Sequence, residues 1–304
     1  ISLLWMILGK IRDLVTSSTA CTIPIICVGN ITIGGNGKTP TSIKLRDLLK
    51  DLGFRPHILS RGYKSRFKGP HFVEPTIDSF EDVGDEALMM ALYGPTWISR
   101  NRHAGIKSAI KAGANVIILD DGFQNNVVQK DFSILVIESS IGFGNGFLIP
   151  AGPLRETVPR GLKKTDLIIM IGEQANQSIS KKHAWLMKRV PTIKGSLIPK
   201  PSNINLKGKT VIAFAGIAHP EKFKTTLESL GAVILNFQSF ANHKPFKIKK
   251  LKQLIIEAQK TEAILITTEK DLVRIPNNLQ HKFRALKVEL KLHHEDILID
   301  KLKN

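Results

Sequence analysis

A glycine-rich turn that ends in a lysine and a threonine directly follows a short apolar run. The run covers residues 25–28, and the turn reads Gly-Gly-Asn-Gly-Lys-Thr over residues 34–39. Glycines let successive backbone N–H groups turn toward a polyphosphate, a lysine can bridge the outer phosphates, and a threonine hydroxyl can ligate Mg²⁺. The turn therefore predicts a phosphate-binding loop, although Thr32 stands where the strict pattern has glycine. The predicted phosphate contacts are Thr32, Ile33, Gly34, Gly35, Asn36, Gly37, Lys38 and Thr39.

A second chemical signal is a pair of carboxylates at the end of an apolar run. Residues 116–119 are apolar, and Asp120 and Asp121 follow them directly. At the carboxyl end of a strand beside a phosphate loop, an aspartate can hold Mg²⁺ directly or through water. An ordinary strand-to-turn junction could have the same sequence, so this signal depends on the loop. Together the two segments predict binding of a nucleoside triphosphate.

Three further kinds of segment contain residues that suit a phosphoryl-transfer site. Asp85, in Gly-Asp-Glu over residues 84–86, is either a helix cap or a general base. The segment 60–63 joins the planar cation of an arginine to a tyrosine phenol, which suits a sugar phosphate but is also common in loops. Residues 142–146 and 150–156 are rich in glycine and proline, and loops of this kind often line sites.

Short β-branched runs recur along the chain with helix-length gaps between them. This pattern predicts an α/β fold of the P-loop NTPase type, with a parallel sheet flanked by helices on both faces. The segment after Lys38 fits a helix that buries Ile43, Leu45, Leu48, Leu49 and Leu52 and ends at Gly53. The predicted strands cover residues 23–28, 57–59, 115–119, 132–137, 167–171, 210–214, 232–236 and 263–267.

The chain is long enough for two domains. Its stretch 191–209 is rich in proline and glycine and has little periodicity, so it predicts the join between them. A larger domain would cover residues 1–200, and a smaller C-terminal α/β domain would cover residues 201–304. The closing stretches 290–296 and 301–304 indicate solvated surface.

The net charge of +18 predicts attraction to phosphates, whether in nucleic acid, anionic lipid headgroups or a phosphorylated metabolite. Low aromatic content disfavours a base-stacking groove for single strands. Near the N-terminus, an apolar stripe over residues 4–15 marks one face of a helix. This helix could lie in a membrane interface or pack on its own domain, and no segment reaches the roughly 18 apolar residues that span a bilayer. Of the two cysteines, Cys27 falls in the core run, and the absence of a disulfide framework suits a reducing cytoplasm.

These motifs, taken in order, resemble the tetraacyldisaccharide 4'-kinase family. The likeness spans about residues 23–274 and rests on the loop, on residues 60–63, 84–86 and 120–124, on both glycine-rich loops, and on Thr-Thr-Glu-Lys-Asp at 267–271. That family also has threonine at the position of Thr32. The resemblance implies ATP-dependent phosphorylation, with Mg²⁺, of the 4'-hydroxyl of a tetraacylated glucosamine disaccharide 1-phosphate.

The resemblance also implies a role for each matching residue. Asp85 would accept the hydroxyl proton with His243 as its partner, and Lys38 would neutralise the β- and γ-phosphates. The smaller domain would close over the site. The implied metal and phosphate environment comprises Thr39, Asp120, Asp121, Gln124 and Glu156, and the implied substrate contacts are Asn30, Arg61, Tyr63 and Arg102.

The same resemblance sets expectations about partners and location. The partners would be an acylated glucosamine disaccharide phosphate and an anionic membrane surface, not nucleic acid. The protein would be a monomer, held peripherally at the cytoplasmic face of the bacterial inner membrane.

Four residues depart from the family pattern. Asn125 replaces a histidine, Ala87 a proline, Lys64 a glycine and Asn242 an aspartate. Three other interpretations therefore stay open. They are another P-loop small-molecule kinase or ligase, a nucleic-acid-binding ATPase that tracks a phosphate backbone, and a relative that binds substrate without turnover.

Overall fold

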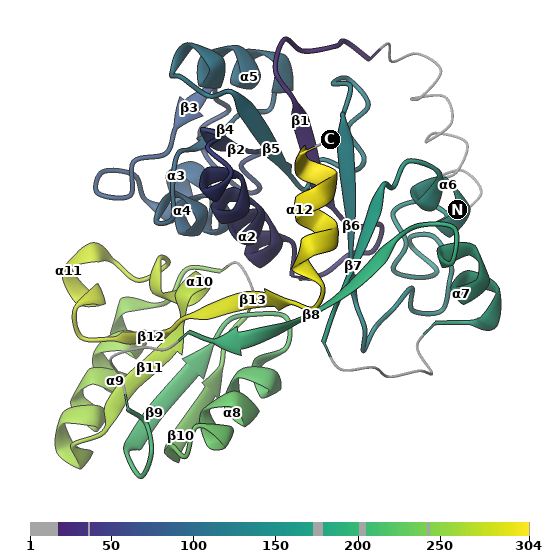
Figure 1. Cartoon of the computed structure of the whole chain (residues 1–304). Coiled ribbons are helices and arrows are strands. Elements are labelled where there is room, and N and C mark those ends of the chain that lie inside the picture. The colour runs from purple at the N-terminus through teal and green to yellow at the C-terminus, as the bar shows by residue number, and fades with distance from the viewer. Residues whose placement is uncertain (1–17, 36, 173–178, 201–204, 242–243, 304) are drawn as a thin grey trace.

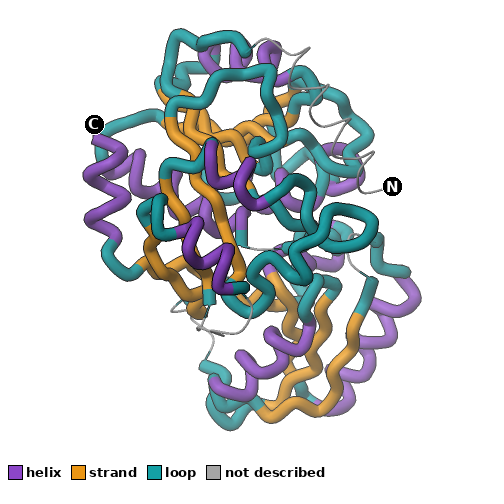
Figure 2. The backbone as a smooth tube through the Cα atoms, turned by 90° about the vertical axis from the view of Figure 1, so that its right-hand side faces the viewer, coloured by secondary structure: helices purple, strands orange, loops and turns teal. Residues whose placement is uncertain are grey.

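Two sheets organise the protein, as the computed structural model shows (Figures 1 and 2). It describes residues 18–35, 37–172, 179–200, 205–241 and 244–303. One sheet has nine strands and the other has four. The larger unit is built around the nine-stranded sheet, and the smaller unit around the four-stranded sheet.

The nine-stranded sheet has the order β13-β8-β7-β6-β1-β5-β2-β4-β3. All pairs from β8 to β4 are parallel, while the edge strands β13 and β3 pair antiparallel with their neighbours. The predicted parallel sheet is confirmed. Its strands are β1 (Ile25–Gly29), β2 (Pro56–Ser60), β3 (His71–Phe72), β4 (Thr96–Ile98), β5 (Val116–Asp120), β6 (Phe132–Glu138), β7 (Leu167–Ile171), β8 (Thr192–Pro199) and β13 (Val288–Leu292).

Helices cover both faces of this sheet because its strands are apolar on both sides. In β1, Ile26 and Val28 pack toward one layer of helices, and Ile25 and Cys27 face the other. Cys27 is fully buried, and burial raises the pKa of its thiol to about 11. The first layer comprises α2 (Lys38–Asp51), α3 (Phe80–Val83), α4 (Asp85–Ala91) and α12 (Glu295–Lys303). The second comprises α5 (Arg102–Lys111), α6 (Val158–Lys163) and α7 (Lys181–Met187).

Helix α2 forms as predicted directly after the phosphate loop. It buries Ile43, Leu45, Leu48 and Leu49 against the sheet, while the predicted Leu52 is the C-cap residue and is only partly buried. Gly53 follows its C-cap residue with φ 87°, a left-handed backbone that glycine adopts without steric cost. The helix thus ends where predicted, and its first residues follow the loop at the carboxyl end of β1.

The smaller unit repeats the same architecture on a reduced scale. Its sheet has the order β10-β9-β11-β12 with all pairs parallel. Alternate residues of β9 face opposite helices, since Val211 and Ala213 pack toward α8 and Ile212 and Phe214 toward α9. Its elements are β9 (Thr210–Ala215), α8 (Pro220–Ser229), β10 (Val233–Ser239), α9 (Ile248–Thr261), β11 (Ile264–Thr268), α10 (Glu269–Leu272), α11 (Asn277–Gln280) and β12 (Arg284–Leu286).

The chain returns to the larger unit at its end, which the sequence prediction missed. Strand β13 leaves the smaller unit and pairs with β8, and α12 then lies beside α2 (Figure 1). Leu290 and Leu292 are 2% and 7% exposed, so the prediction of solvated surface over residues 290–296 was wrong for them. The stretch 191–209, predicted as the join between the domains, begins with β8, a strand of the larger sheet whose antiparallel partner lies about ninety residues further along the chain.

The expected N-terminal helix falls within residues 1–17, outside the described part of the chain. Among the residues that are described, no helix has both the length and the apolar character needed to cross a bilayer.

The burial of β13 gives a test of this topology. Leu290→Ala should lower the free energy of unfolding by about 2–5 kcal/mol, because it leaves a cavity in the core between the sheet and its first helix layer. The neighbouring Lys291 is exposed, and Lys291→Ala should change that free energy by no more than about 0.5 kcal/mol. Urea denaturation followed by circular dichroism measures both. Equal effects would contradict the placement of β13 in the large sheet.

Candidate active site

The phosphate loop lies between β1 and α2, in the strand–loop–helix context that the motif requires. Gly34 and Gly37 have φ values of 121° and 83°, which favour glycine. Lys38 is 8% exposed, and its Nζ lies 3.4 Å from the carbonyl oxygen of Gly34. The ammonium is therefore folded back over its own loop, where a bound polyphosphate would lie. Asn36 lies outside the described residues.

The segment 150–156 is pinned to the start of this loop by backbone hydrogen bonds. Ile33 N donates to Pro153 O at 2.8 Å, and Arg155 N donates to Ile31 O at 2.7 Å. Thr32 forms a β-bridge with Leu154 between them. The backbone of Thr32 does not take positive φ, so the glycine of the strict pattern is not required at this position.

Asp120 ends β5, directly beside β1 in the sheet. The register pairs Val28 with Asp120, which brings the carboxylate to the phosphate loop. Ser42 of α2 donates to Asp120 Oδ1 at 2.8 Å, while Oδ2 is buried without a hydrogen-bond partner. Burial, together with the negative charges of Glu86 and Asp121, raises the pKa of Asp120 to about 7, although Ser42 and Lys38 act in the opposite direction.

Asp121 has the opposite electrostatic setting. Arg155 Nη1 lies 3.0 and 3.1 Å from its two carboxylate oxygens, and Lys38 Nζ lies 3.7 Å from Oδ1. Burial acts to raise the pKa of Asp121, but the charges of Lys38 and Arg155 outweigh it, so the pKa is lowered. Two adjacent carboxylates thus have pKa values pushed apart by their surroundings, which is a common property of catalytic sites.

These residues fit a hard cation such as Mg²⁺, which takes one or two carboxylates together with substrate phosphate oxygens. The unpartnered Oδ2 of Asp120 would supply a ligand atom, with Asp121 next to it in the chain and Thr39 in the first turn of α2. In the described part of the chain, no three His, Cys, Asp or Glu side chains gather into a cage that could hold a metal alone.

Gln124 and Glu156 hydrogen-bond to each other behind these carboxylates. Gln124 Nε2 donates to Glu156 Oε1 at 3.0 Å and to Asn30 O at 2.8 Å. Glu156 also forms an ion pair of 2.8 Å with Lys164. Arg155 Nη1 contacts Gln124 Oε1 at 3.3 Å and so joins this pair to Asp121. In this geometry Gln124 and Glu156, both predicted to belong to the metal environment, contact the site through Asn30 and Arg155.

The sequence reasoning missed Arg155 and Ser42. Arg155 lies within the segment 150–156 that was singled out, and its position before Glu156 was the available signal. Ser42 had no such signal, because a serine one turn into a helix is common.

Asn30 is 0% exposed, and its side-chain nitrogen and oxygen have no hydrogen-bond partner. A buried amide without partners is costly, so this environment favours a polar ligand.

Asp85 lies at the first position of α4 and is 6% exposed. Gly84 occupies the N-cap, so Asp85 is not the capping residue, and its Oδ1 accepts from Glu86 N at 2.9 Å. A Cβ added to Gly84 would lie 2.9 Å from Tyr63 O, so the motifs at 60–63 and 84–86 pack against each other. Because Glu86 contributes to the pKa of Asp120, the start of α4 is within electrostatic reach of the carboxylates at β5.

The predicted substrate residues are divided between surface and interior. Arg61 is exposed, and Tyr63 is 60% exposed. Arg102, by contrast, is 4% exposed and near Asp120, and burial lowers the pKa of its guanidinium. The described residues do not include His243, so its predicted role stays a prediction.

Two of the departures from the family pattern have a structural account. Lys64, where the pattern has glycine, adopts φ 60° and so keeps the left-handed backbone. Asn125 Oδ1 accepts from Val127 N at 3.2 Å and stabilises its own turn.

A glycine loop between a central parallel strand and a helix, with a lysine at the helix start and an aspartate at the end of the neighbouring strand, defines the class of P-loop phosphotransferases. Comparison with known proteins agrees. The profile of the family described as LpxK, tetraacyldisaccharide-1-P 4'-kinase, matches residues 1–304. The chain belongs to this family.

Individual relatives give the same result. The chain is 43% identical over 277 residues to a tetraacyldisaccharide 4'-kinase of Dinoroseobacter shibae, covering 91% of this chain and 82% of that protein. It is 44% identical over 270 residues to one of Paramagnetospirillum magneticum, covering 88% and 82%. The crystal structure of LpxK from Aquifex aeolicus in complex with ATP is similar with a TM-score of 0.79 and 28% identity, over 99% of this chain and 96% of that one. These findings confirm the predicted family, fold and enzyme class, a kinase that phosphorylates a hydroxyl group.

The buried Asp120 gives a prediction about stability. Its pKa is raised from 3.8 to about 7, so folding becomes less favourable as the pH rises from about 4 to 7, and the full cost is present above pH 7. Asp120→Asn removes this cost. Without nucleotide or Mg²⁺, the variant should unfold at a temperature higher than the wild type by about 3 °C or more at pH 8.

This difference should shrink toward pH 5, as measured by differential scanning fluorimetry. Asp51→Asn, an exposed carboxylate on α2, is the control and should show no such change with pH. A constant difference for Asp120→Asn would show that burial does not disfavour its ionised form.

Proposed function

We propose that this protein transfers the γ-phosphate of ATP to the 4'-hydroxyl of a tetraacylated glucosamine disaccharide 1-phosphate, a late step of lipid A biosynthesis. The observation that carries the proposal is the placement of Asp85, a buried carboxylate at the start of α4 whose neighbour Glu86 is within electrostatic reach of Asp120. The phosphate loop and the proposed acceptor-side carboxylate are thus both held by the nine-stranded sheet and its first helix layer. The relatives named as tetraacyldisaccharide 4'-kinases supply the identity of the acceptor.

On the donor side, the loop amides and Lys38 bind the phosphates of ATP. Lys38 lies close to both Gly34 and Asp121, so its charge is available where the β- and γ-phosphates would meet. Thr39, Asp120 and Asp121 would hold Mg²⁺, with Gln124 and Glu156 orienting their neighbours. When bound, that ion neutralises charge that develops on the phosphate oxygens.

On the acceptor side, Asp85 accepts the proton of the sugar hydroxyl as the oxygen attacks phosphorus. Phosphoryl transfer passes through a loose transition state, so alignment and charge stabilisation matter more than a strong base. A carboxylate with ordinary basicity is therefore sufficient. His243, which the family resemblance assigns as the partner of Asp85, would tune this proton transfer from the smaller unit.

The lipid acceptor calls for a surface that meets a membrane. The net charge of +18 favours anionic headgroups, and the segment between β2 and α3 exposes apolar and basic side chains together. These exposed residues are Arg61, Tyr63, Lys64, Arg66, Phe67, Lys68, Phe72 and Ile77. The protein would therefore act as a peripheral monomer at the cytoplasmic face of the bacterial inner membrane.

Phosphate transfer itself is the direct test. With γ-labelled ATP and a tetraacyldisaccharide 1-phosphate in mixed micelles, we expect label to appear in the lipid at the 4'-position. If folded protein produced no lipid-linked label, the proposed activity would be wrong. Hydrolysis of ATP that is stimulated by DNA but not by the lipid would favour a nucleic-acid-dependent ATPase instead.

The same assay tests the role of Asp85. Asp85→Ala should lower turnover by about 10²-fold or more while the KM for ATP stays within about twofold, because the variant removes the base and leaves the phosphate loop intact. Glu81→Ala on α3 removes an exposed carboxylate nearby and should leave both quantities near the wild-type values. Loss of ATP binding in Asp85→Ala would mean that this residue is structural.

Membrane attachment can be tested by flotation. The full chain should float with vesicles that contain an anionic phospholipid and remain unbound with purely zwitterionic vesicles. Lys64→Glu with Lys68→Glu should reduce the bound fraction by about tenfold at low salt, since each basic residue near the surface contributes roughly 1 kcal/mol. The control is Lys252→Glu with Lys260→Glu, which makes the same charge change on α9. Equal losses in the two variants would mean that net charge, and not this segment, directs binding.

A further inference from the structure

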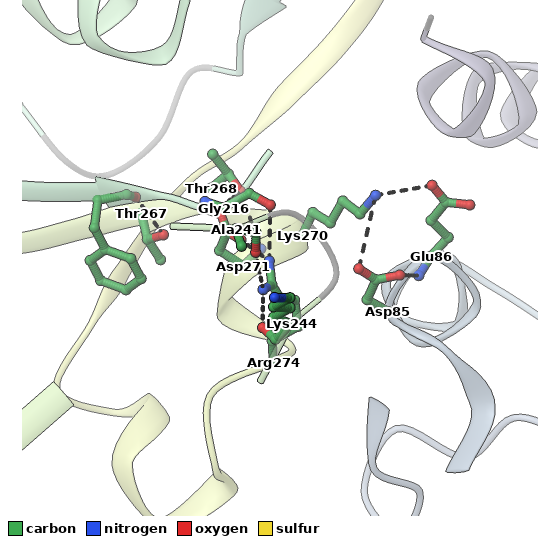
Figure 3. A network of polar contacts seen from close by, with 11 residues as sticks. Asp85, Glu86, Gly216, Ala241, Lys244, Thr267, Thr268, Lys270, Asp271 and Arg274 are labelled. Atoms are coloured by element: carbon green, nitrogen blue, oxygen red, sulfur yellow. Dashed lines mark hydrogen bonds and ion pairs between the residues drawn. The ribbon is translucent and has the colours of Figure 1, made fainter. Parts of the chain in front are cut away.

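A lysine of the smaller unit reaches the two carboxylates that begin α4 in the larger unit (Figure 3). Lys270 Nζ lies 3.0 Å from Glu86 Oε1 and 3.9 Å from Asp85 Oδ2. The three side chains are 19%, 31% and 7% exposed, respectively. The ammonium is therefore partly shielded from water and lies between two adjacent negative charges, which would otherwise repel each other.

The backbone that carries Lys270 is held by a buried network (Figure 3). Asp271 accepts from Thr268 Oγ1 at 2.8 Å, from Gly216 N at 2.9 Å and from Arg274 Nη1 at 2.6 Å. Asp271 and Arg274 are 0% and 1% exposed. A paired charge buried this deeply keeps its geometry, because breaking the pair would leave an uncompensated charge in the interior. The backbone of Lys270 is thus held in place within the smaller unit.

The residue before Lys270 also crosses to the larger unit. Glu269 Oε1 accepts from the hydroxyl of Tyr93 at 2.6 Å, in the segment that follows α4. Two consecutive residues of the motif 267–271 therefore contact the α4 region, one through a phenol and one through carboxylates. This arrangement accounts for a motif that the nucleotide chemistry leaves unused.

We propose that Lys270 is a positioning residue for Asp85, which it holds ionised and oriented from across the interface between the two units. The proposal rests on the assignment of Asp85 as the proton acceptor. The charged groups beside this carboxylate include Glu86, on the same helix, and Lys270, on α10. Glu86 disfavours the ionised form of Asp85, and Lys270 favours it. Removing the lysine takes away this favourable charge and leaves the unfavourable charge of Glu86 in place.

Lys270→Met removes the ammonium and keeps most of the side-chain length. We expect turnover to fall by about tenfold or more, with the KM for ATP within about twofold. The acid limb of the pH dependence of turnover should move upward by about one pH unit, because loss of a nearby opposite charge disfavours the carboxylate. Lys270→Arg keeps the charge and should restore the wild-type limb.

Lys222→Met is the matched control, since Lys222 forms another ion pair between the units, with Glu138. It should leave the acid limb in place. If Lys270→Met does not fold, Lys270→Gln removes the charge and keeps a hydrogen-bond donor, and it should show the same displacement of the limb. An acid limb at the wild-type pH in the folded uncharged variant would overturn the proposal.

Asp85→Ala, assayed in parallel, separates the two assignments. If Asp85→Ala keeps its turnover, the proton-acceptor role fails and the role of Lys270 fails with it. If Asp85→Ala is inactive while the uncharged Lys270 variant has the wild-type limb, the role of Lys270 alone is wrong.

Discussion

The burial of Asp120 beside the phosphate loop is the constraint on which the site depends. A carboxylate in this position costs free energy until a cation or proton compensates it, and its pKa of about 7 expresses that cost. The groups around Asp120 compensate this cost only in part. Ser42 binds one oxygen, the other is left without a partner, and the neighbouring Asp121 is kept ionised by Lys38 and Arg155. The free energy of unfolding is thereby lowered at a site where binding of a metal–nucleotide complex can raise it again.

The topology places each chemical group at the same edge of the sheet. β1 lies between β5 and β6, so the loop after β1 meets the carboxylates that follow β5. The segment 150–156, which leads into α6, bonds to the loop and carries Arg155 to Asp121. Asp85 arrives from the helix layer above the sheet. Because the carboxyl ends of parallel strands share one edge, the loop after β1, the carboxylates after β5 and the segment after β6 come together.

The smaller unit is tied to the larger one by both backbone and charge. Strand β13 returns to the nine-stranded sheet, while Lys270 and Glu269 contact the region of α4. The buried pair of Asp271 and Arg274 makes the second unit a rigid support for these contacts, and Arg274 also bonds the carbonyl oxygens of Ala241 and Lys244, which flank His243 in the sequence. The proposed acceptor side of the site is therefore connected to the core of the smaller unit.

The sequence by itself determined the parallel sheet, the phosphate loop, helix α2 and the carboxylates at 120 and 121, because each depends on local periodicity, glycine or a short spacing. It could not show that β8 and β13 pair, since their registers are set by residues about ninety positions apart. Nor could it show that Thr32 tolerates a side chain, that Ser42 and Arg155 complete the carboxylate environment, or that Lys270 lies at Asp85. Only the tertiary structure decided these points, because burial and charge neighbourhood arise from long-range packing and not from sequence proximity.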